Sequence, residues 1–545
     1  MTLFERILTA RGLATRAARQ AFLQPDYMAV KHDPFLLPDM KKAVVRLKQA
    51  REQGEKIVIY GDYDIDGLSA TALLLDAFGK FGFKDVDAFI PNRFIEGYGM
   101  TMGAVDKVRD MGADLIVTVD TGSLCHAEIA YATSLGIDTV VTDHHNVAET
   151  PPPSVAAVNP KFPGHSYPFR DLCGAGVAFK LVQALQTELD GLPDGYEKWL
   201  LDLVALGTVC DIVTLADENR ANVYWGLEVL KKQQRPGLKA LMAVAGIEPE
   251  QVNARHLGFG LGPRMNAAGR LETAQHALDM LVARDGLAAL EASEKLEELN
   301  AKRRGIQDAI FEEACVQAEE LANDRVLVVS SDGWNHGVIG IVASKLVEKY
   351  NKPVFIIGER GEEATGSARS FGDFSAADAV RAADDIIIKG GGHGAAAGVT
   401  LATEKIGDFR RRVNDFYDSL QLTNQERYLL PRADVEIADF SEIDEELVEN
   451  LARMEPFGNG NPEPVVKITT ASVLSARRMG ADGQHVKLTL RDQNGKALQM
   501  LAFNAPEAFF CEPGDEVVAW FQPTINEWQG VRTVEGRLVH MALLD

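Results

Sequence analysis

Short apolar runs alternate with segments of helical periodicity in the first third of the chain. Three continuous apolar runs lie at 56–60, 114–119 and 139–142. The stretch from Ser69 to Phe81 repeats apolar side chains at helical spacing. Continuous apolar strands separated by helices are typical of a parallel sheet covered on both faces. We therefore predict a doubly wound α/β domain, whose regular structure is interrupted by the prolines at 151–153.

The middle of the chain is predicted to be helical. Residues 175–245 carry Leu, Ala and Val at three- and four-residue spacing. From 285 to 323 the chain is rich in Ala, Glu, Leu and Lys and contains no proline. One face of this stretch holds Leu296, Leu299, Ile306, Ile310 and Ala314. We predict a long connector helix, with Gly305 as its weak point at a cost of about 1 kcal/mol against Ala.

The last two regions differ in pattern. Apolar runs at 325–329 and 353–357 and a Gly-rich loop at 390–394 predict a second α/β unit. After about residue 425, alternating strands and turns such as Asn494-Gly495 predict a small β-barrel. The predicted organisation is a helical segment 1–50, a catalytic domain 51–284, a connector helix 285–323, an α/β domain 324–422 and a barrel 423–545.

Acidic and histidine side chains follow each predicted strand of the first domain. The first strand leads into Asp62, Asp64 and Asp66, the second into Asp120, and the third into Asp143-His144-His145. Ligands bind at the carboxyl ends of strands in open α/β sheets, so these clusters should converge. Converging carboxylates repel each other unless divalent cations neutralise them. Carboxylate and imidazole ligands without thiolates suit Mn²⁺ or Mg²⁺, and two ions with a bridging Asp would activate a water.

A calcium-binding EF-hand is the competing interpretation of the first cluster. Asp62, Asp64, Asp66 and Gly67 match the start of such a loop, but its twelfth position is Leu73 instead of Glu. The flanking element is also a strand. These two departures exclude the EF-hand.

These motifs resemble the DHH phosphoesterase superfamily, and within it the RecJ exonucleases specific for single-stranded DNA. The resemblance rests on the segments 60–67, 96–99, 143–145, 207–213 and 262–270. It continues through 336–340, 367–370 and 390–398, which resemble a DHHA1 domain, and through 456–464, which resembles the start of an OB-fold. It covers nearly the whole chain and implies a DHH domain, a DHHA1-like domain and an OB-fold barrel.

The resemblance implies roles for individual residues. Two Mn²⁺ or Mg²⁺ ions are expected among Asp62, Asp64, Asp66, Asp120, His144 and Asp211. Asp64, Asp120 and His145 are expected to be catalytic, with His145 beside the scissile phosphate. Which of the first three Asp residues contact metal directly stays open. The loop Thr121 to His126 departs from the Asn-Gly-type residues expected after Asp120.

A second group of residues is expected to hold DNA. Gly-rich backbone without Cβ atoms can form an anion nest, and an Arg fork fits a phosphate. The predicted contacts are Arg264, Asn266, Arg270, His336, Ser367, Arg369, Gly391, Gly392, His393 and Trp528. His336 fits a position in the protein core and a contact with the DNA strand equally well. Trp528, near a predicted turn, is the barrel aromatic that we expect to stack on bases.

Composition changes this picture in one respect. Lys and Arg number 56 against 79 Asp and Glu, a net charge of −23. Such a charge argues against a nucleic-acid binder and favours a small-molecule enzyme, unless the basic residues are concentrated locally. We therefore expect a narrow positive channel in an acidic surface. Five separated cysteines without a C-x-x-C pair, and no apolar run long enough to span a bilayer, predict a cytoplasmic protein without membrane contact.

Three functions follow in order of preference. The first is a two-metal 5′→3′ exonuclease that releases mononucleotides from single-stranded DNA in recombination and repair. A phosphoesterase of short oligonucleotides or cyclic dinucleotides is the second, and a non-enzymatic DNA-holding scaffold is the third. No Walker A motif occurs, so cleavage should need no ATP. The resemblance also suggests a monomer that works beside a RecQ-type helicase and a single-strand-binding protein.

Overall fold

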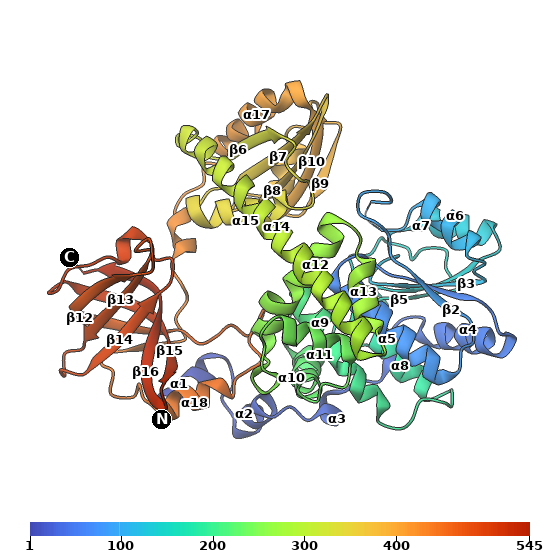
Figure 1. The fold of residues 1–545 in the computed structure, drawn as a ribbon, viewed down its shortest axis with the longest axis horizontal. Helices are drawn as coiled ribbons and strands as arrows, with labels where there is room; N and C mark the ends of the chain where they lie inside the picture. The colour runs from blue at the N-terminus through green and yellow to red at the C-terminus, as the bar shows by residue number, and fades with distance from the viewer. Residues whose placement is uncertain (98, 545) are drawn as a thin grey trace.

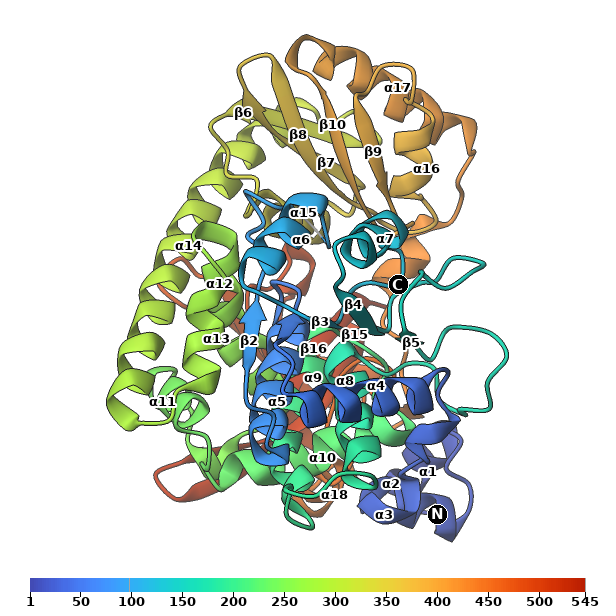
Figure 2. The ribbon, with the colours of Figure 1, turned by 90° about the vertical axis from the view of Figure 1, so that its right-hand side faces the viewer.

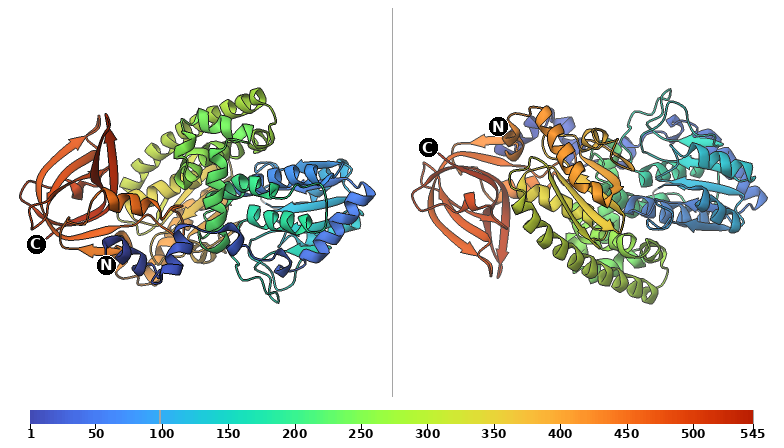
Figure 3. Two further views of the ribbon diagram at one scale, coloured as in Figure 1. Left: turned by 90° about the horizontal axis from the view of Figure 1, so that it is seen from below. Right: turned by 90° about the horizontal axis from the view of Figure 1, so that it is seen from above.

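The computed structural model describes residues 1–97 and 99–544 of the chain (Figure 1). A parallel sheet with its helices, a second α/β domain and a β-barrel occupy three corners of the molecule. Helices lie between the parallel sheet and the barrel in both views of Figure 3. Among the described residues, no helix combines the length and the apolar character that crossing a membrane would require.

The parallel sheet has the strand order β2-β1-β3-β4-β5. Its strands are β1 (Ile57–Tyr60), β2 (Val86–Phe89), β3 (Leu115–Val119), β4 (Asp138–Thr142) and β5 (Ala156–Val158). All neighbours are parallel, which confirms the doubly wound sheet. The strand order reverses between β1 and β3, and this switch point opens a crevice at their carboxyl ends. The sequence did not predict β2, which is only half-buried, or β5, which has three residues.

Helices cover both faces of this sheet. Alternate residues of β1 contribute to different cores, since Ile57 and Ile59 face one side while Val58 and Tyr60 face the other. The first side packs against α4 (Met40–Gln53), α5 (Ile65–Phe81) and α8 (Gly174–Gln186). The second packs against α6 (Met102–Asp110) and α7 (His126–Ser134).

A helical layer extends the first core toward the barrel. Its helices are α9 (Leu201–Cys210), α10 (Asp217–Lys231), α11 (Pro236–Val244), α12 (Gly262–Leu271) and α13 (Gln275–Val282). A π-helical turn at His256–Leu261 precedes α12. Helix α9 is buried along most of its length and packs against α5 and α10. This contact places the end of α9 beside the carboxyl ends of the strands.

The predicted connector is the 35-residue helix α14 (Gly286–Glu320). Figure 2 shows it rising from the first domain to the second. Leu296 and Leu299 belong to the core of the first domain, whereas Ile310 and Ala314 belong to a core shared with the second. The helix is therefore both a spacer and a packed element of the two domains that it joins.

The second α/β domain contains a mixed sheet of order β6-β7-β8-β10-β9. Its strands are β6 (Leu327–Asp332), β7 (Val354–Arg360), β8 (Glu363–Arg369), β9 (Lys389–Gly392) and β10 (Ala396–Ala402), with helices α15 (Ile339–Tyr350), α16 (Ala376–Arg381) and α17 (Ile406–Ser419). The prediction of a Gly-rich loop at 390–394 is wrong for its first three residues. Gly390, Gly391 and Gly392 form an edge strand paired with β10, because bare glycine backbone can still make a ladder.

The C-terminal strands close into a five-stranded barrel, as predicted. They are β12 (Val466–Met479), β13 (His485–Arg491), β14 (Ala497–Ala502), β16 (Val531–Leu543) and β15 (Glu516–Trp528), and β15 returns to pair with β12. Phe440, Leu488 and Phe521 are among its fully buried side chains. Strand β11 (Val435–Ile437) and helix α18 (Glu445–Ala452) precede the barrel.

The first 50 residues serve two domains. In helix α1 (Leu3–Ala10), Leu3, Ile7 and Leu8 belong to the barrel core, whereas α4 packs on the parallel sheet. Helices α2 (Arg16–Leu23) and α3 (Tyr27–Val30) lie between them in sequence. The N-terminal segment therefore joins the barrel to the catalytic domain.

The connector supplies a first testable prediction. Gly305 lies exposed in α14, and a Cβ atom there would meet nothing within 4 Å. Gly305→Ala should stabilise the helix by about 0.5–1 kcal/mol, because Ala has less conformational entropy to lose. Thermal unfolding and amide hydrogen exchange across α14 would measure the gain.

Gly226→Ala is the matched control in another helix. A Cβ at Gly226 would press on the Leu201 carbonyl and lie 2.5 Å from the Cβ of Ala205. This variant should unfold at a lower temperature than the wild-type chain. Equal effects of the two substitutions would contradict the packing described for α10 and α14.

Candidate metal centre

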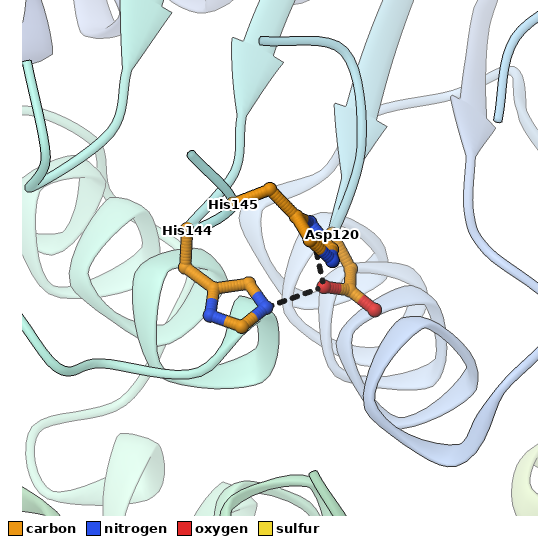
Figure 4. Close-up of side chains that lie close together, drawn as sticks. All are labelled: Asp120, His144 and His145. Carbon is orange, nitrogen blue, oxygen red and sulfur yellow. Dashed lines mark ion pairs between the residues drawn. The ribbon is translucent and has the colours of Figure 1, made fainter. Parts of the chain in front are cut away.

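Three loops at the carboxyl ends of neighbouring strands converge on one point. Asp62 follows β1, Asp120 follows β3, and His144 follows β4. Asp211 joins them from the C-terminal cap of α9. Figure 4 shows His144 and His145 both directed at the Asp120 carboxylate. The tertiary structure thus brings together side chains that are separated by up to about 150 residues of sequence.

The two later Asp residues of the first motif are fixed by helix N-termini. Asp64 caps α5, and its Oδ1 accepts the N–H groups of Asp66 at 2.9 Å and Gly67 at 3.1 Å. Asp66 accepts the Gly174 and Ala175 N–H groups at 2.5 Å and 2.8 Å, at the start of α8. Helix N-termini favour negative charge, so both carboxylates are held as acceptors before any cation binds.

His144 lies at the centre of the cluster. Its Nε2 is 3.0 Å from Asp120 Oδ1 and 3.7 Å from both Asp66 Oδ2 and Asp211 Oδ2. Burial, followed by the charge of His145, lowers the pKa of His144 to about 3. The ring is therefore neutral at physiological pH, which is the state that ligates metal.

Asp143 keeps His145 protonated, in contrast to the neutral His144. The His145 Nδ1 lies 2.9 Å from Asp143 Oδ1, which also accepts the His144 and His145 N–H groups. Burial lowers the pKa of His145, but the hydrogen bond and charge of Asp143 outweigh it and raise the pKa to about 9. Burial raises the pKa of Asp143, yet contacts with His145 bring it below its usual range. A cationic imidazole therefore stands beside the carboxylates.

The pKa values of four other carboxyl groups at the centre are raised. Burial, followed by neighbouring Asp charges, raises the pKa of Asp62 to about 7, that of Asp66 to about 6 and that of Asp211 to about 8. The same causes raise the pKa of Asp120 well above its usual range. Like charges crowded in a buried place cannot all ionise unless positive charge enters.

The donor set fits two divalent cations. Three groups of potential ligand atoms, each within 4.8 Å of one another, are Asp62 with Asp64 and Asp120, Asp66 with His144 and Asp211, and Asp120 with both histidines. Buried Asp62 Oδ1, Asp120 Oδ1 and His144 Nε2 make no hydrogen bond of good geometry in the described residues. Oxygen and imidazole donors with unsatisfied atoms at the convergence point suit Mn²⁺ or Mg²⁺.

Several residues that support this centre were assigned no role from the sequence, although Asp143 was named in the third cluster. Asp143 orients His145, and the Gly174 N–H group holds Asp66. Gly207 on α9 faces Asp66, where any side chain would collide with Asp66 Oδ1. Arg93 lies in the cavity beside Asp62 and places its guanidinium 4.3 Å from the Tyr63 ring centre. Three of these residues had a local signal: Asp143 belongs to the 143–145 motif, Gly207 begins the 207–213 motif, and Arg93 precedes the 96–99 motif, whose Tyr98 lies outside the described residues.

A cavity of about 300 Å³ opens beside the carboxylates. Asp62, Asp64, Asp66 and Asp211 line it together with two predicted DNA contacts, Asn266 and Arg270. Arg270 is half-buried and donates to the Gly337 carbonyl at 2.9 Å, at the boundary with the second domain. Burial, then Arg93, Arg303 and Arg369, lowers the pKa of Arg270 to about 10.

These four arginines form a basic cluster, which we define as Arg93, Arg270, Arg303 and Arg369. In the part of the chain that the structure describes, no ion pair within 4.0 Å joins any of them to an acidic side chain, and Arg303 donates to the amides of Asn300 and Gln307 instead. Arg369 extends from β8 and contacts Ser367 Oγ at 3.3 Å, so one further predicted residue, Ser367, adjoins the cluster. The cluster is a local excess of positive charge within a chain of charge −23.

Other predicted contacts have different surroundings. Arg264 pairs with Glu297 of α14 at 2.5 Å and donates to the Gly260 carbonyl, so its guanidinium is directed at α14. His336 lies 3.2 Å from the Gly358 carbonyl of β7. Gly391 and Gly392 lie in the exposed strand β9, and His393 follows it at the turn to β10. Trp528 is 71% exposed at the end of the β15–β16 hairpin.

Family models match three parts of the chain. The DHH family N-terminal domain matches residues 56–208, the DHHA1 domain matches 323–419, and the RecJ OB domain matches 433–540. Their order agrees with the parallel-sheet domain, the mixed-sheet domain and the barrel.

Curated relatives match nearly the whole chain. A single-stranded-DNA-specific exonuclease RecJ of Bacillus subtilis is 39% identical over 96% of this chain, which spans 65% of that relative. The protein of the same name from Escherichia coli is 34% identical over 92% of this chain and 89% of its own length.

Solved structures share the fold. The crystal structure of RecJ from Thermus thermophilus in complex with Mn²⁺ is 30% identical, with a TM-score of 0.84 over 99% of this chain and 76% of that chain. The complex of that protein with Mg²⁺ gives a TM-score of 0.77 at 27% identity over 99% of this chain and 74% of its own.

Gly207 provides a test of the centre's packing. In Gly207→Ala, the new methyl group would press on Asp66 Oδ1 and lie 2.8 Å from the Cβ of Ala175. We expect Mn²⁺ affinity to fall by about tenfold or more, because Asp66 must move from its place at the start of α8. Calorimetric titration of Mn²⁺ would measure this, with Gly305→Ala as a helical glycine control that leaves affinity unchanged.

The pair of Asp143 and His145 makes a prediction about pH. In Asp143→Asn the raised pKa of His145, about 9, should fall to or below the ordinary value of about 6.5. The wild-type ring stays protonated until the pH rises through about 9, whereas the variant ring loses its proton near neutrality. Metal-free histidine NMR titration would follow the change, and an unchanged His145 pKa would contradict the assigned contact.

Proposed function

The chain belongs to the RecJ family of DHH phosphoesterases, and from this premise we propose that it is a metal-dependent exonuclease that degrades single-stranded DNA. We further propose that it begins at the 5′ end and releases mononucleotides. The observation that carries this proposal is the convergence of five carboxylates and a neutral histidine on one point, beside an unpaired basic cluster. The relatives' name and the two complexes with Mn²⁺ and Mg²⁺ support it.

The metal-holding residues are proposed as two sets. Asp62, Asp64 and Asp120 hold one divalent cation, and Asp66, His144 and Asp211 hold the other, with Asp120 and His144 between them. The two cations, when bound, polarise a water and neutralise charge on the scissile phosphate. The chain itself fixes the donors, since helix N-termini hold Asp64 and Asp66 and burial keeps His144 neutral.

His145 is proposed to contact the scissile phosphate. Asp143 occupies its Nδ1, so Nε2 is the ring atom that would approach substrate. With its pKa raised to about 9, His145 is positively charged at neutral pH. It can stabilise the phosphoryl charge that develops in the transition state, or donate its proton to the departing 3′ oxygen.

The basic cluster is proposed to hold the strand at its 5′ side. Arg270 and Arg93 border the carboxylate cavity, and Arg369 with Ser367 extends the same positive region into the second domain. The planar guanidinium forks of Arg93, Arg270 and Arg369 suit phosphate oxygens. Arg303 contributes its charge only, because it is buried and its terminal nitrogens donate to Asn300 and Gln307. Placed beside the metal centre, this cluster would favour cleavage near a terminal phosphate.

The barrel is proposed to hold the downstream strand. Trp528 is exposed at a hairpin end, and Lys467 lies over the face of Trp520 at 5.2 Å. OB-folds bind single strands through a basic groove and stacking aromatics. We also propose that the enzyme acts as a cytoplasmic monomer, supplied with single strands by a helicase of the RecQ type and a single-strand-binding protein, in recombination and repair.

Digestion of labelled substrates tests the proposal directly. A long 5′-phosphorylated strand, a 3′-labelled copy, a blunt duplex and a dinucleotide would be incubated with Mn²⁺ or Mg²⁺ and without ATP. We expect mononucleotides from the 5′ end of the single strand and little from the duplex. Faster turnover of the dinucleotide than of the long strand would favour the small-substrate phosphoesterase instead.

Asp120 provides the matching variant. It has a left-handed backbone with φ of 61°, a conformation that Asn tolerates better than Ala. Asp120→Asn and Asp120→Ala should both reduce cleavage by about 10³-fold or more, because a ligand of one proposed cation and the neighbour of His144 is lost, while single-strand affinity is retained. Single-turnover rates and strand binding in Ca²⁺ would measure the two effects, and turnover at the wild-type rate would reject the mechanism.

A further inference from the structure

The chain reverses sharply just after the metal-site residue Asp211. Helix α9 ends at Cys210, Asp211 caps it through a bond to the Gly207 carbonyl, and α10 begins only six residues later. Ile212 adopts φ of 59° within this reversal although it is β-branched, and its side chain is 69% exposed. Such a conformation is strained and needs support from its surroundings. Burial of Ile212 does not supply that support.

One residue of the barrel domain brackets the reversal. Asn459 Nδ2 donates to the Ile212 carbonyl at 2.8 Å, and the Leu215 N–H donates to the Asn459 carbonyl at 2.8 Å. From within the catalytic domain, Asn219 Nδ2 donates to the Thr214 carbonyl at 3.0 Å. The two ends of the reversal are therefore tied to one amino acid, Asn459, which lies 247 positions from Ile212 in sequence.

The glycines on either side of Asn459 allow this close approach. A Cβ at Gly458 would lie 2.7 Å from Leu215 Cδ1, and one at Gly460 would lie 2.7 Å from Thr214 Cγ2. Gly460 also has φ of 77°, which favours glycine. We call residues 457–461 the docking loop.

The segment just before the docking loop, residues 454–456, is held on the catalytic domain. Arg220 of α10 is buried and donates to the carbonyls of Met454, Glu455 and Pro456 at 2.9–3.2 Å. Asn461 is also buried and donates to the Met454 and Pro456 carbonyls at 2.9 Å and 2.8 Å. The chain just before Asn459 is thus anchored, so the position of Asn459 is set by rigid contacts.

We propose that the docking loop positions Asp211 for metal binding, with Asn459 as the positioning residue. The barrel then does more than hold the strand: its attachment maintains the ligand group of Asp66, His144 and Asp211. This inference rests on the proposed function only in taking that group as a metal position. In Figures 1 and 3 the barrel lies on the far side of the helical layer from the parallel sheet, so the docking loop links the two across α9 and α10.

The test measures metal affinity without DNA. Full-length Asn459→Ala and wild-type chains, stripped of metal, would be titrated with Mn²⁺ and followed by electron paramagnetic resonance. We expect one of two Mn²⁺ sites to weaken about 3- to 10-fold, the effect of losing one hydrogen bond, while the other is unchanged. At limiting Mn²⁺ the kcat of the variant for single-stranded DNA should fall, while its KM for DNA should stay unchanged. At saturating Mn²⁺ the cleavage rate should recover.

Two further variants separate positioning from general damage. Asn494→Ala removes an amide that hydrogen-bonds to Asp439 within the barrel domain, and it should leave both Mn²⁺ sites unchanged. Ile212→Gly relieves the left-handed strain, because glycine adopts this backbone freely. Combined with Asn459→Ala, it should restore part of the lost Mn²⁺ affinity, a rescue that a simple loss of domain packing would not show.

The results that would overturn the role of Asn459 differ from the result that would overturn the proposed function. Unchanged affinity at both Mn²⁺ sites in a folded Asn459→Ala chain would overturn the inference. So would a loss of single-strand affinity alone, which would assign Asn459 to the DNA path. If the wild-type chain binds two Mn²⁺ ions but cleaves no single-stranded DNA, the proposed function fails, while the affinity comparison still decides the role of Asn459.

Discussion

Mutual repulsion among buried carboxylates is the constraint on which the rest of the structure depends. Asp62, Asp66, Asp120 and Asp211 are brought so close that burial and neighbouring charge raise the pKa of each. The protein offsets this cost with oriented dipoles at helix N-termini and with a positively charged His145. Divalent cations complete the balance. The folded chain therefore presents a set of carboxylates that favours cation binding. The positive charge of His145 lies beside them, where a phosphate would bind.

The three domains contribute to this centre in different ways. The parallel sheet supplies the switch point at which its strands end, the second α/β domain brings Arg369 toward Arg270, and the barrel reaches back through Asn459 to the chain after Asp211. Helix α14 sets the separation of the first two, and the N-terminal segment ties the first to the third. The geometry of the centre consequently depends on how the three domains pack together as well as on the fold of the parallel-sheet domain.

The net charge of −23 by itself disfavours the proposed nucleic-acid substrate, because a sum over the chain does not show where the charges lie. Much of the acidic excess lies in surface stretches such as 436–449, where Glu442, Glu445 and Glu449 pair with arginines from other elements. The basic cluster, in contrast, has no acidic partner within 4.0 Å among the described residues. This uneven placement of charge is how an acidic chain can still attract a polyanion to one site.

The sequence alone predicted the strands that end at the centre and the residue types that follow them, because both depend on local patterns, although it did not predict β2 or β5. Apolar runs predicted β1, β3 and β4, and the residues after them named the carboxylates and His144. The tertiary structure alone decided which groups act together. Asp143 became the partner of His145, Arg264 was directed at Glu297, the glycines at 390–392 formed a strand, and Asn459 reached Ile212. These outcomes depend on contacts between distant segments, and a spacing pattern along one chain carries no information about how domains pack.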